Sequence, residues 1–371
     1  MNKIFCLLMT TLSSLTVAAQ QTDYKLIIGT YTAPGKSEGI YVYNFNTSTA
    51  DFKAVSIAKN VINPSFLALT ADRKFLYAVN EDGDKSKVSA FSFDAASGDI
   101  GFLNSRPAEG ADPCYLIADD QHVLAANYTG GSIAVFGRDP SGALTPVKQV
   151  IQHTGSSINK SRQSSAHVHM VRFTPDHKYV VVNDLGEDKV YFYTYDKEAK
   201  DSILVLKNSI DVEPGSGPRH IVFSPNGKFA YLVQELNGGI TAFNYADGTL
   251  KKIQETTMVA KDFKGENGGS DIQLSADGKF LYASNRGTAN TITTFAIGKD
   301  GKLISKGQIS TNGSGPRAFT IDPSGNWVLV GHQNTNDIVI FKRNKTTGIL
   351  TPTGKKIEIG APVSFLFVPM K

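Results

Sequence analysis

GPRHIVFSPNGKFAYLVQE, residues 217–235, is one copy of a two-part phrase that recurs around this chain. Similar phrases stand at 63–81, NPSFLALTADRKFLYAVNE, and at 269–286, GSDIQLSADGKFLYASNR. Each copy holds two short runs of β-forming residues joined by a tight polar turn, such as Asn226-Gly227 or Asp277-Gly278. A unit that returns about every 50 residues with this content is typical of a radial β architecture, in which each unit forms one blade.

A polar residue ends the second run of every unit and so counts the units. The series, spaced 47–56 residues apart, is Thr30, Asn80, Asn127, Asn183, Gln234, Asn285 and His332. The run at 361–369 resembles a first strand without a second, and the run at 26–31 resembles a second strand without a first. Pairing them closes a ring and removes exposed sheet edges. We therefore predict an all-β, seven-bladed β-propeller with four-stranded blades, closed by pairing of the N- and C-terminal strands. Two β-sandwiches would fit the length but not the regular repeat.

The chain opens with a segment typical of a secretory signal. Lys3 precedes an apolar run at 4–17 and small residues at 18–19, and a polar start follows at Gln20. The run is too short, and too rich in Ser and Thr, to indicate a membrane span; a buried first strand is the alternative interpretation. We predict a signal peptide at 1–19, a propeller domain at 20–371, and a periplasmic or secreted protein.

Cysteine and charge content narrow the classes of function. Cleavage would remove Cys6 and leave Cys114 as the only cysteine, so the mature chain has no internal disulfide. The net charge is +4, and the basic residues are scattered, without a basic run that has aromatic residues among it. This pattern argues against binding to nucleic acid. We expect a monomer whose partner is a small molecule, and no cofactor.

Propeller topology gathers the chemistry at one end of the ring. In each unit, the residues just before the first strand and just after the second lie at the same mouth of the central channel, because the two strands are antiparallel. The predicted mouth residues are His167, His169, Arg219, His220, Glu235, Asp271, Arg286 and Arg317, joined by Glu81, Asn127, Tyr128, Asn285 and Gln333. Such convergence of polar groups is what a pocket for a polar substrate requires. For Asn127 and Asn285, capping of strand ends is the alternative, and Asp72, Asp176, Asp277 and Asp322 read as turn formers.

His167 and His169 also form a His-x-His pair, which alternation places on one side of a strand. A metal site is therefore conceivable. No third ligand follows at a metal-like spacing, and the neighbouring arginines would repel a divalent ion. We predict no metal.

Seven short motifs together resemble the seven-bladed β-propeller lactonase family, which includes a bacterial 6-phosphogluconolactonase and a fungal 3-carboxymuconate lactonising enzyme. The motifs stand at 28–31, 126–132, 166–169, 183–186, 217–220, 284–287 and 315–319, so the resemblance covers nearly the whole mature chain. It implies a catalytic cluster of His169, Arg219, Glu235 and Arg286. The implied substrate-binding residues are His167, His220, Asp271, Asn285, Arg317, Asn127 and Tyr128. Two features depart from the family pattern: Asp271 stands where the family more often has Glu, and the chain carries the predicted signal peptide at 1–19.

The resemblance implies hydrolysis of a sugar-acid lactone, of the 6-phosphogluconolactone type, by an activated water. Glu235 or His169 would be the base, and Arg219 or Arg286 would stabilise the oxyanion. The remaining arginine, with Arg317 or His220, would hold a carboxylate or phosphate of the substrate. Alternatives are a non-catalytic envelope propeller that binds glycan or protein, a cycloisomerase acting on a carboxymuconate-type lactone, and a metal-dependent lactonase, which the arginines oppose.

Overall fold

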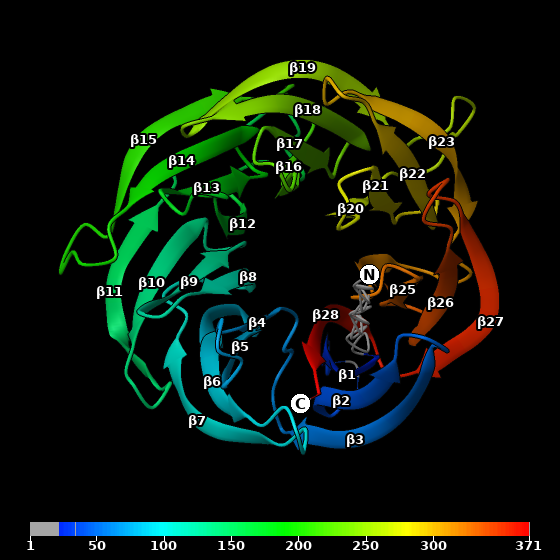
Figure 1. The fold of residues 1–371 in the computed structure, drawn as a ribbon. Coiled ribbons are helices and arrows are strands. Elements are labelled where there is room, and N and C mark those ends of the chain that lie inside the picture. Colours follow the sequence, from blue (N-terminus) through cyan, green and yellow to red (C-terminus); the bar gives the residue numbers. More distant parts are fainter. Residues whose placement is uncertain (1–21, 34, 371) are drawn as a thin grey trace, which may run out of the picture.

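The computed structural model describes residues 22–33 and 35–370, and in them 28 β-strands form seven antiparallel four-stranded sheets arranged as a ring (Figure 1). Blade 1 has the order β28-β1-β2-β3, and each later blade takes four consecutive strands, from β4–β7 in blade 2 to β24–β27 in blade 7. This confirms the predicted seven-bladed propeller. The predicted signal peptide at 1–19 lies outside the described residues.

The strands of blades 1 to 3 are β1 (Asp23–Thr30), β2 (Gly39–Asn46), β3 (Asp51–Lys59), β4 (Leu67–Leu69), β5 (Phe75–Asn80), β6 (Lys87–Phe93), β7 (Ile100–Pro107), β8 (Pro113–Ala118), β9 (His122–Asn127), β10 (Ser132–Arg138) and β11 (Leu144–Gln152), with one short 3-10 helix, η1 (Gly83–Lys85). Those of blades 4 and 5 are β12 (Val168–Phe173), β13 (Tyr179–Asp184), β14 (Lys189–Tyr195), β15 (Leu204–Asp211), β16 (Pro218–Phe223), β17 (Phe229–Gln234), β18 (Gly239–Ala246) and β19 (Thr249–Thr257). Blades 6 and 7 hold β20 (Gly269–Leu274), β21 (Phe280–Asn285), β22 (Thr291–Ile297), β23 (Leu303–Ser310), β24 (Pro316–Ile321), β25 (Trp327–His332), β26 (Asp337–Arg343) and β27 (Leu350–Glu358), and β28 (Pro362–Pro369) returns to blade 1.

The ring closes where the sequence predicted. The last strand, β28, pairs antiparallel with β1 from Tyr24 opposite Pro369 to Thr30 opposite Pro362. Blade 1 therefore takes its innermost strand from the C-terminus and the other three from the N-terminus. This pairing covers the edge of β1 that would otherwise be unpaired, which is the reason that propellers join their ends in this way.

The predicted turns lie on the face opposite the mouth. In blade 6, Asp277 accepts hydrogen bonds from the Ser275 hydroxyl at 2.6 Å and from the Lys279 backbone N–H at 3.1 Å. Asp72 and Asp176 make the same pair of contacts in their own blades. These side chains hold the tight turn between the first two strands, as turn-forming Asp does, which confirms the structural reading of this series.

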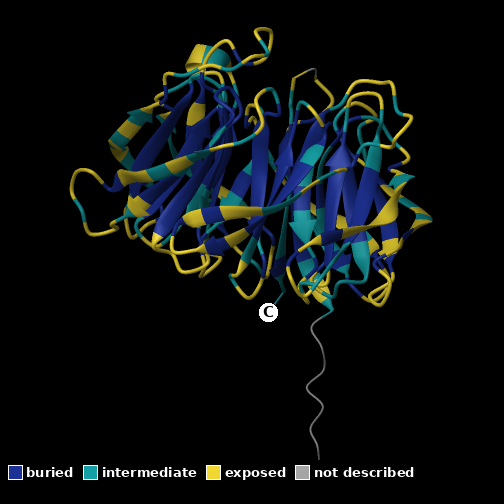
Figure 2. Ribbon diagram, turned by 90° about the horizontal axis from the view of Figure 1, so that it is seen from above, coloured by how far each residue is buried: buried dark blue, intermediate teal, exposed yellow. Residues whose placement is uncertain are grey.

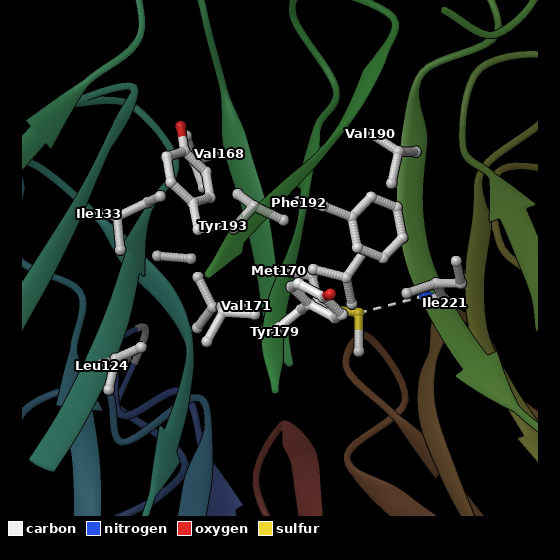
Figure 3. Close-up of a cluster of buried hydrophobic side chains, with 14 of the residues drawn as sticks. Leu124, Ile133, Val168, Met170, Val171, Tyr179, Val190, Phe192, Tyr193 and Ile221 are labelled. Carbon is white, nitrogen blue, oxygen red and sulfur yellow. Dashed lines mark hydrogen bonds between the residues drawn. The ribbon is translucent and has the colours of Figure 1, made fainter. Parts of the chain in front are cut away.

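Apolar side chains fill the space between neighbouring blades. Figure 3 shows one such cluster, in which Leu124 of β9, Met170 of β12 and Ile221 of β16 belong to three consecutive blades. Buried tyrosines add a repeated latch: Tyr77 and Tyr282 each donate a hydrogen bond to a glycine carbonyl in a turn of the next blade, Gly142 and Gly348, at 2.8 Å. The inner strands are largely buried, and exposed residues concentrate on the outer strands and the loops of both faces (Figure 2). No helix in the described part of the chain is long and apolar enough to cross a membrane.

Candidate active site

A polar pocket of about 520 Å³ opens at the mouth of the channel where the second strands end. We call it the mouth pocket. Its lining consists of Tyr31, Glu81, Cys114, Tyr128, Arg162, His169, Glu235, Asn267, Gly268, Arg286, Gly287, Gly315, Arg317, Gln333 and Asn334. A second space, the channel chamber, lies between the inner strands and shares Cys114 and Arg317 with the mouth pocket. Five of the eleven predicted site residues line the mouth pocket itself: His169, Glu235, Arg286, Arg317 and Tyr128.

Repeated β-bulges aim side chains into this region. At the start of the inner strand the partner register skips one residue in several blades, and the extra residue is Cys114 in β8, His169 in β12, Arg219 in β16 and Arg317 in β24. A bulge leaves its extra residue out of the ladder and redirects its side chain, and bulges are frequent beside active sites. The same type of bulge thus presents a thiol, an imidazole and two guanidinium groups to the mouth pocket or to the channel chamber.

Glu235 is the centre of the site. It follows the last residue of β17, its side chain is 8% exposed, and its carboxylate accepts three charge-assisted contacts. Arg219 Nε donates to Oε2 at 2.9 Å, Arg286 Nη2 lies 3.0 Å from the same oxygen, and Arg162 Nη2 donates to Oε1 at 2.6 Å. The predicted proximity of Glu235 and Arg286, from neighbouring blades, is confirmed. The third partner, Arg162, was not among the residues predicted from the sequence.

These contacts decide the charge of Glu235. Burial alone would raise its pKa, but the guanidinium groups of Arg286, Arg219 and Arg162 outweigh burial and lower the pKa to about 2. Glu235 is therefore ionised at neutral pH. A carboxylate with so low a pKa is a poor proton acceptor, and its geometry suits the task of holding two or three arginines in place.

His169 has the opposite character. Its ring is buried, with Nε2 4.0 Å from Glu235 Oε2 and Nδ1 3.7 Å from the Cys114 sulfur. Burial, followed by the positive charges of Arg219 and other neighbours, lowers its pKa well below 6.5. The imidazole is therefore neutral at neutral pH and has a lone pair available for a proton. Cys114 is unsuited to nucleophilic attack, because burial raises its pKa.

Arg219 is clamped on two sides. Besides its contact with Glu235, Nη1 donates to the Ser270 carbonyl at 2.7 Å and faces His220 Nε2 at 3.4 Å. Its remaining nitrogen, Nη2, forms no hydrogen bond with residues 22–33 or 35–370, which leaves one donor edge of a rigid guanidinium for a ligand. Burial and the charges of Arg286 and Arg317 lower the pKa of Arg219 to about 9.

His220 and Asp271 lie beneath Arg219, in the lining of the channel chamber, and not in that of the mouth pocket. His220 Nδ1 is 3.2 Å from Asp271 Oδ1, and Asp271 Oδ2 accepts the backbone N–H of Phe319 at 3.2 Å. Burial and the charge of Arg219 lower the pKa of His220 to about 4, so its Nε2 can accept from Arg219. Both therefore support Arg219, while their role as substrate ligands stays a prediction, because the channel chamber that they line is itself a cavity of about 410 Å³.

Asn127 and Asn285 are buried and bond inwards. The Asn127 amide donates to the Ala108 carbonyl at 3.1 Å, and Asn285 Oδ1 accepts the Gly268 backbone N–H at 2.9 Å. Neither lines the mouth pocket, and these bonds are those expected of the alternative interpretation, the capping of strand ends. That they bind substrate stays a prediction.

Tyr128 and His167 lie against each other at the edge of the mouth pocket. Tyr128 lines the mouth pocket and stacks on the ring of His167 with centroids 4.5 Å apart. His167 does not line the pocket, and its Nδ1 lies 3.0 Å from the Tyr128 carbonyl oxygen. We infer that His167 supports the wall, while Tyr128 faces the ligand space.

Arg317 and Glu81 form the opposite wall. The Arg317 guanidinium lies 5.3 Å over the ring of Tyr31, and the Tyr31 hydroxyl donates to Glu81 Oε1 at 2.9 Å. The Ser65 hydroxyl also bonds Glu81. The guanidinium of Arg317 makes no hydrogen bond or ion pair with the described residues, and Arg317 lines both the mouth pocket and the channel chamber.

The only group of described residues with a geometry for metal binding is not the His167–His169 pair but His153, Asp184 and Glu187. Its ligand atoms are already engaged. His153 contacts Asp184 Oδ2 at 2.7 Å and the Tyr193 hydroxyl at 2.8 Å, while Glu187 accepts the Gly155 N–H at 2.6 Å and the Tyr191 hydroxyl. This satisfied network anchors the segment at 153–167 and does not fit a metal.

Arg162 comes from that segment, which has no counterpart in the repeat. It comprises the 15 residues between β11 and β12, the longest connection between blades in the described chain. The second longest, between β19 and β20, supplies Asn267 and Gly268 to the same pocket. Unusual length was thus the one signal in the sequence that could have pointed to Arg162.

Comparison with known proteins agrees with this geometry. The family described as "Lactonase, 7-bladed beta-propeller" matches residues 25–367. A protein of Bacillus subtilis named 6-phosphogluconolactonase is 35% identical over 352 residues, which cover 94% of this chain and 99% of that protein. A crystal structure described as a putative 6-phosphogluconolactonase from Bacteroides fragilis is 42% identical, with a TM-score of 0.90 and coverage of 95% and 99%. A Pseudomonas aeruginosa protein described as a periplasmic gluconolactonase is 34% identical, with a TM-score of 0.90 and coverage of 94% and 100%.

Proposed function

This chain belongs to the seven-bladed β-propeller lactonase family, and from that premise we propose that it hydrolyses the ring ester of a sugar-acid lactone of the gluconolactone or 6-phosphogluconolactone type. The predicted family resemblance is confirmed. Relatives named 6-phosphogluconolactonase or gluconolactonase, at 34–42% identity over most of the chain, support this reaction class. The observation that carries it is a neutral, buried His169 beside two arginines that Glu235 holds, Arg286 in the lining of the mouth pocket and Arg219 in that of the channel chamber.

His169 is the proposed general base. Water that attacks the lactone carbonyl must lose a proton, and the neutral imidazole accepts it. Glu235 is bound by three guanidinium groups and stays ionised, so its task is to position arginines. After ring opening, the imidazolium returns the proton to the departing ring oxygen, and the product carboxylic acid ionises at neutral pH.

Arg219 and Arg286 are the proposed oxyanion stabilisers. The carbonyl oxygen gains negative charge as water adds, and a preorganised donor at such an oxygen contributes about 3–4 kcal/mol. Arg219 offers Nη2, because its other donors are fixed on Glu235, Ser270 and His220. No covalent intermediate is needed. The site therefore requires only binding, one base and fixed positive charge.

The test is acid release. Purified protein is assayed in a pH-stat with glucono-δ-lactone, 6-phosphoglucono-δ-lactone and an aromatic-acid lactone, with and without a chelator. We expect a rate above the spontaneous one for at least one sugar lactone, unaffected by the chelator. Rates equal to buffer for every lactone would overturn the catalytic proposal and leave a binding propeller.

We also propose export and a monomeric state. The charge, apolar run and small residues of 1–19 support a cleaved signal peptide, and one solved relative is described as periplasmic. N-terminal sequencing of the exported protein should begin near Gln20, and light scattering should give the mass of one chain; a start at Met1 or a dimer mass would contradict them.

A further inference from the structure

Arg162 is the exposed member of the three arginines on Glu235. Its side chain is 43% exposed, against 17% for Arg286 and 2% for Arg219. Nη2 donates to Glu235 Oε1 at 2.6 Å and to the Tyr128 hydroxyl at 3.2 Å. Nε and Nη1 form no hydrogen bond with any described residue. Arg162 is therefore held by one nitrogen and presents the other donors at the outer side of the mouth pocket.

The chain around Arg162 is built to keep it there. The next residue, Gln163, is fully buried and donates to the Leu185 carbonyl at 2.9 Å. Its backbone carbonyl accepts the Ser157 N–H at 2.9 Å, and its own N–H bonds the Asn159 carbonyl at 2.6 Å. Such a compact, internally bonded segment fixes the backbone on either side of a side chain that reaches into solvent. The segment at 153–167, and not the repeated blade structure, thus positions the side chain of Arg162.

The charges of the site are unbalanced in favour of an anion. Three guanidinium groups line the mouth pocket, those of Arg162, Arg286 and Arg317, against the two carboxylates Glu81 and Glu235. His169 is neutral, so it adds no charge. Arg162, Arg286 and, from the channel chamber, Arg219 share the single charge of Glu235, so positive charge is in surplus, and Arg162 is the most exposed of the three. A planar guanidinium with free donors binds an oxyanion strongly and directionally.

We propose that Arg162 is a specificity-determining residue, which binds an anionic group on the part of the lactone remote from the reacting ester. The proposal rests on the proposed lactone hydrolysis. Nη2 stays on Glu235 while Nε and Nη1 donate to the oxyanion, so that substrate charge is sensed at the outer mouth while the chemistry proceeds at His169. A phosphate and a carboxylate share this chemistry, and a lactone without either gains nothing from Arg162.

The experiment compares wild type, Arg162→Ala and Arg162→Lys with Lys160→Ala. Lys160 is the matched control, because it is an exposed cation on the same segment that bonds only the Ser157 carbonyl. The substrates are 6-phosphoglucono-δ-lactone, a glucarolactone with a free carboxylate, and neutral glucono-δ-lactone. For the anionic lactones, Arg162→Ala should lower kcat/KM about 10–100-fold, mainly through KM, as expected for loss of a charged hydrogen bond. The neutral lactone should change less than about 3-fold, and Arg162→Lys should retain part of the activity.

The two anionic substrates separate the sources of the charge, since a larger loss with one identifies phosphate or carboxylate as the better match. Equal losses with all three lactones would show that Arg162 acts only through Glu235, and no loss with any would show that it is idle; either result overturns the proposal. Lys160→Ala should match wild type throughout.

A second measurement stands apart from catalysis. Inorganic phosphate is titrated calorimetrically into wild type, Arg162→Ala and Lys160→Ala. Arg162→Ala should bind it at least about 10-fold more weakly, whereas Lys160→Ala should not. If wild type hydrolyses no lactone but this difference holds, the proposed reaction fails and the anion site stands. Equal phosphate binding by wild type and Arg162→Ala overturns the anion site whatever the activity.

Discussion

Replacement of Glu235 by Gln tests the central clamp of the site. Gln keeps the shape and one acceptor oxygen but removes the charge that three guanidinium groups share. In the folded protein the pKa of Glu235 is lowered from 4.5 to about 2. A tenfold change in proton affinity equals about 1.4 kcal/mol, so this carboxylate contributes roughly 3 kcal/mol to the free energy of unfolding at pH 7. Its side chain is 8% exposed, so solvent screens the contribution little.

The direction of the pKa shift of Glu235 makes its contribution to stability depend on pH. Because the folded-state pKa is the lower one, the contribution is complete above about pH 4.5 and disappears as pH falls towards 2. Glu235→Gln should therefore lower the melting temperature by about 5 °C at pH 7. At pH 3 the destabilisation should be about half as large or less. Calorimetry of both proteins across this range measures the difference directly.

Glu38→Gln is the matched control. Glu38 pairs with Lys59 at 3.0 Å, but both side chains are more than half exposed. Exposed pairs contribute about 0–1 kcal/mol, so this variant should melt close to wild type. The reasoning is refuted if Glu235→Gln melts like wild type at pH 7, or if its destabilisation stays constant down to pH 3.

The same variant separates the two candidate bases. We expect kcat to fall about 10²–10³-fold, because Arg219 and Arg286 lose the group that aligns them. The pH dependence of the residual activity should remain that of wild type, since His169 is still present. Disappearance of the acid limb in Glu235→Gln would instead make Glu235 the base.

Three further outcomes follow from the same geometry. The wild-type kcat/KM profile should have its acid limb below pH 6.5, because burial lowers the pKa of His169. An acid limb above pH 6.5 would contradict this. His169→Gln should lower kcat about 10²-fold or more. Asp271→Asn removes the carboxylate that orients His220 beside Arg219. We expect kcat to fall about 10-fold with little change in KM. An effect confined to KM would instead indicate that Asp271 binds substrate. Deletion of 363–371 removes most of β28 and exposes the edge of β1. The truncated protein should be insoluble, or its free energy of unfolding should fall by several kcal/mol. An unchanged melting temperature would show that the pairing of β1 with β28 does not stabilise the ring.

The fold was predictable because the same sequence pattern recurs in every blade. Each unit carries the same two-strand phrase, and each polar mark from Thr30 to His332 falls at or next to the end of a second strand. Ring closure followed from the incomplete units at the two ends. The placement of Glu235 and Arg286 at one mouth also followed, because topology alone brings the ends of second strands of neighbouring blades together there. Regular features of this kind need no knowledge of side-chain contacts.

Side-chain direction at the inner strands was not predictable in the same way. Alternation places residues i and i+2 on one face of a strand, and on that basis His167 and His169 were expected together. The bulge at His169 breaks the alternation, so His169 lies by Glu235 while His167 stacks on Tyr128. The same shift at Arg219 leaves His220 in the channel chamber. The position of a bulge cannot be predicted reliably from a single sequence. The pKa of Glu235 could not be predicted either, because it depends on how close three guanidinium groups lie in the folded protein.

The division of labour in the site follows from these two kinds of position. Groups placed by bulges, such as His169 and Arg219, sit on rigid inner strands, and their donors and acceptors are nearly all fixed by neighbouring blades. Rigid placement suits groups that must meet a developing charge, because they need no reorganisation during the reaction. Arg162 instead stands on a segment that no other blade has, and half of its surface is open. A segment outside the repeat can change in length and sequence without disturbing the ring. We therefore infer that in this protein the inner-strand bulges carry the reaction, and that the connection between β11 and β12 sets the preference among lactones.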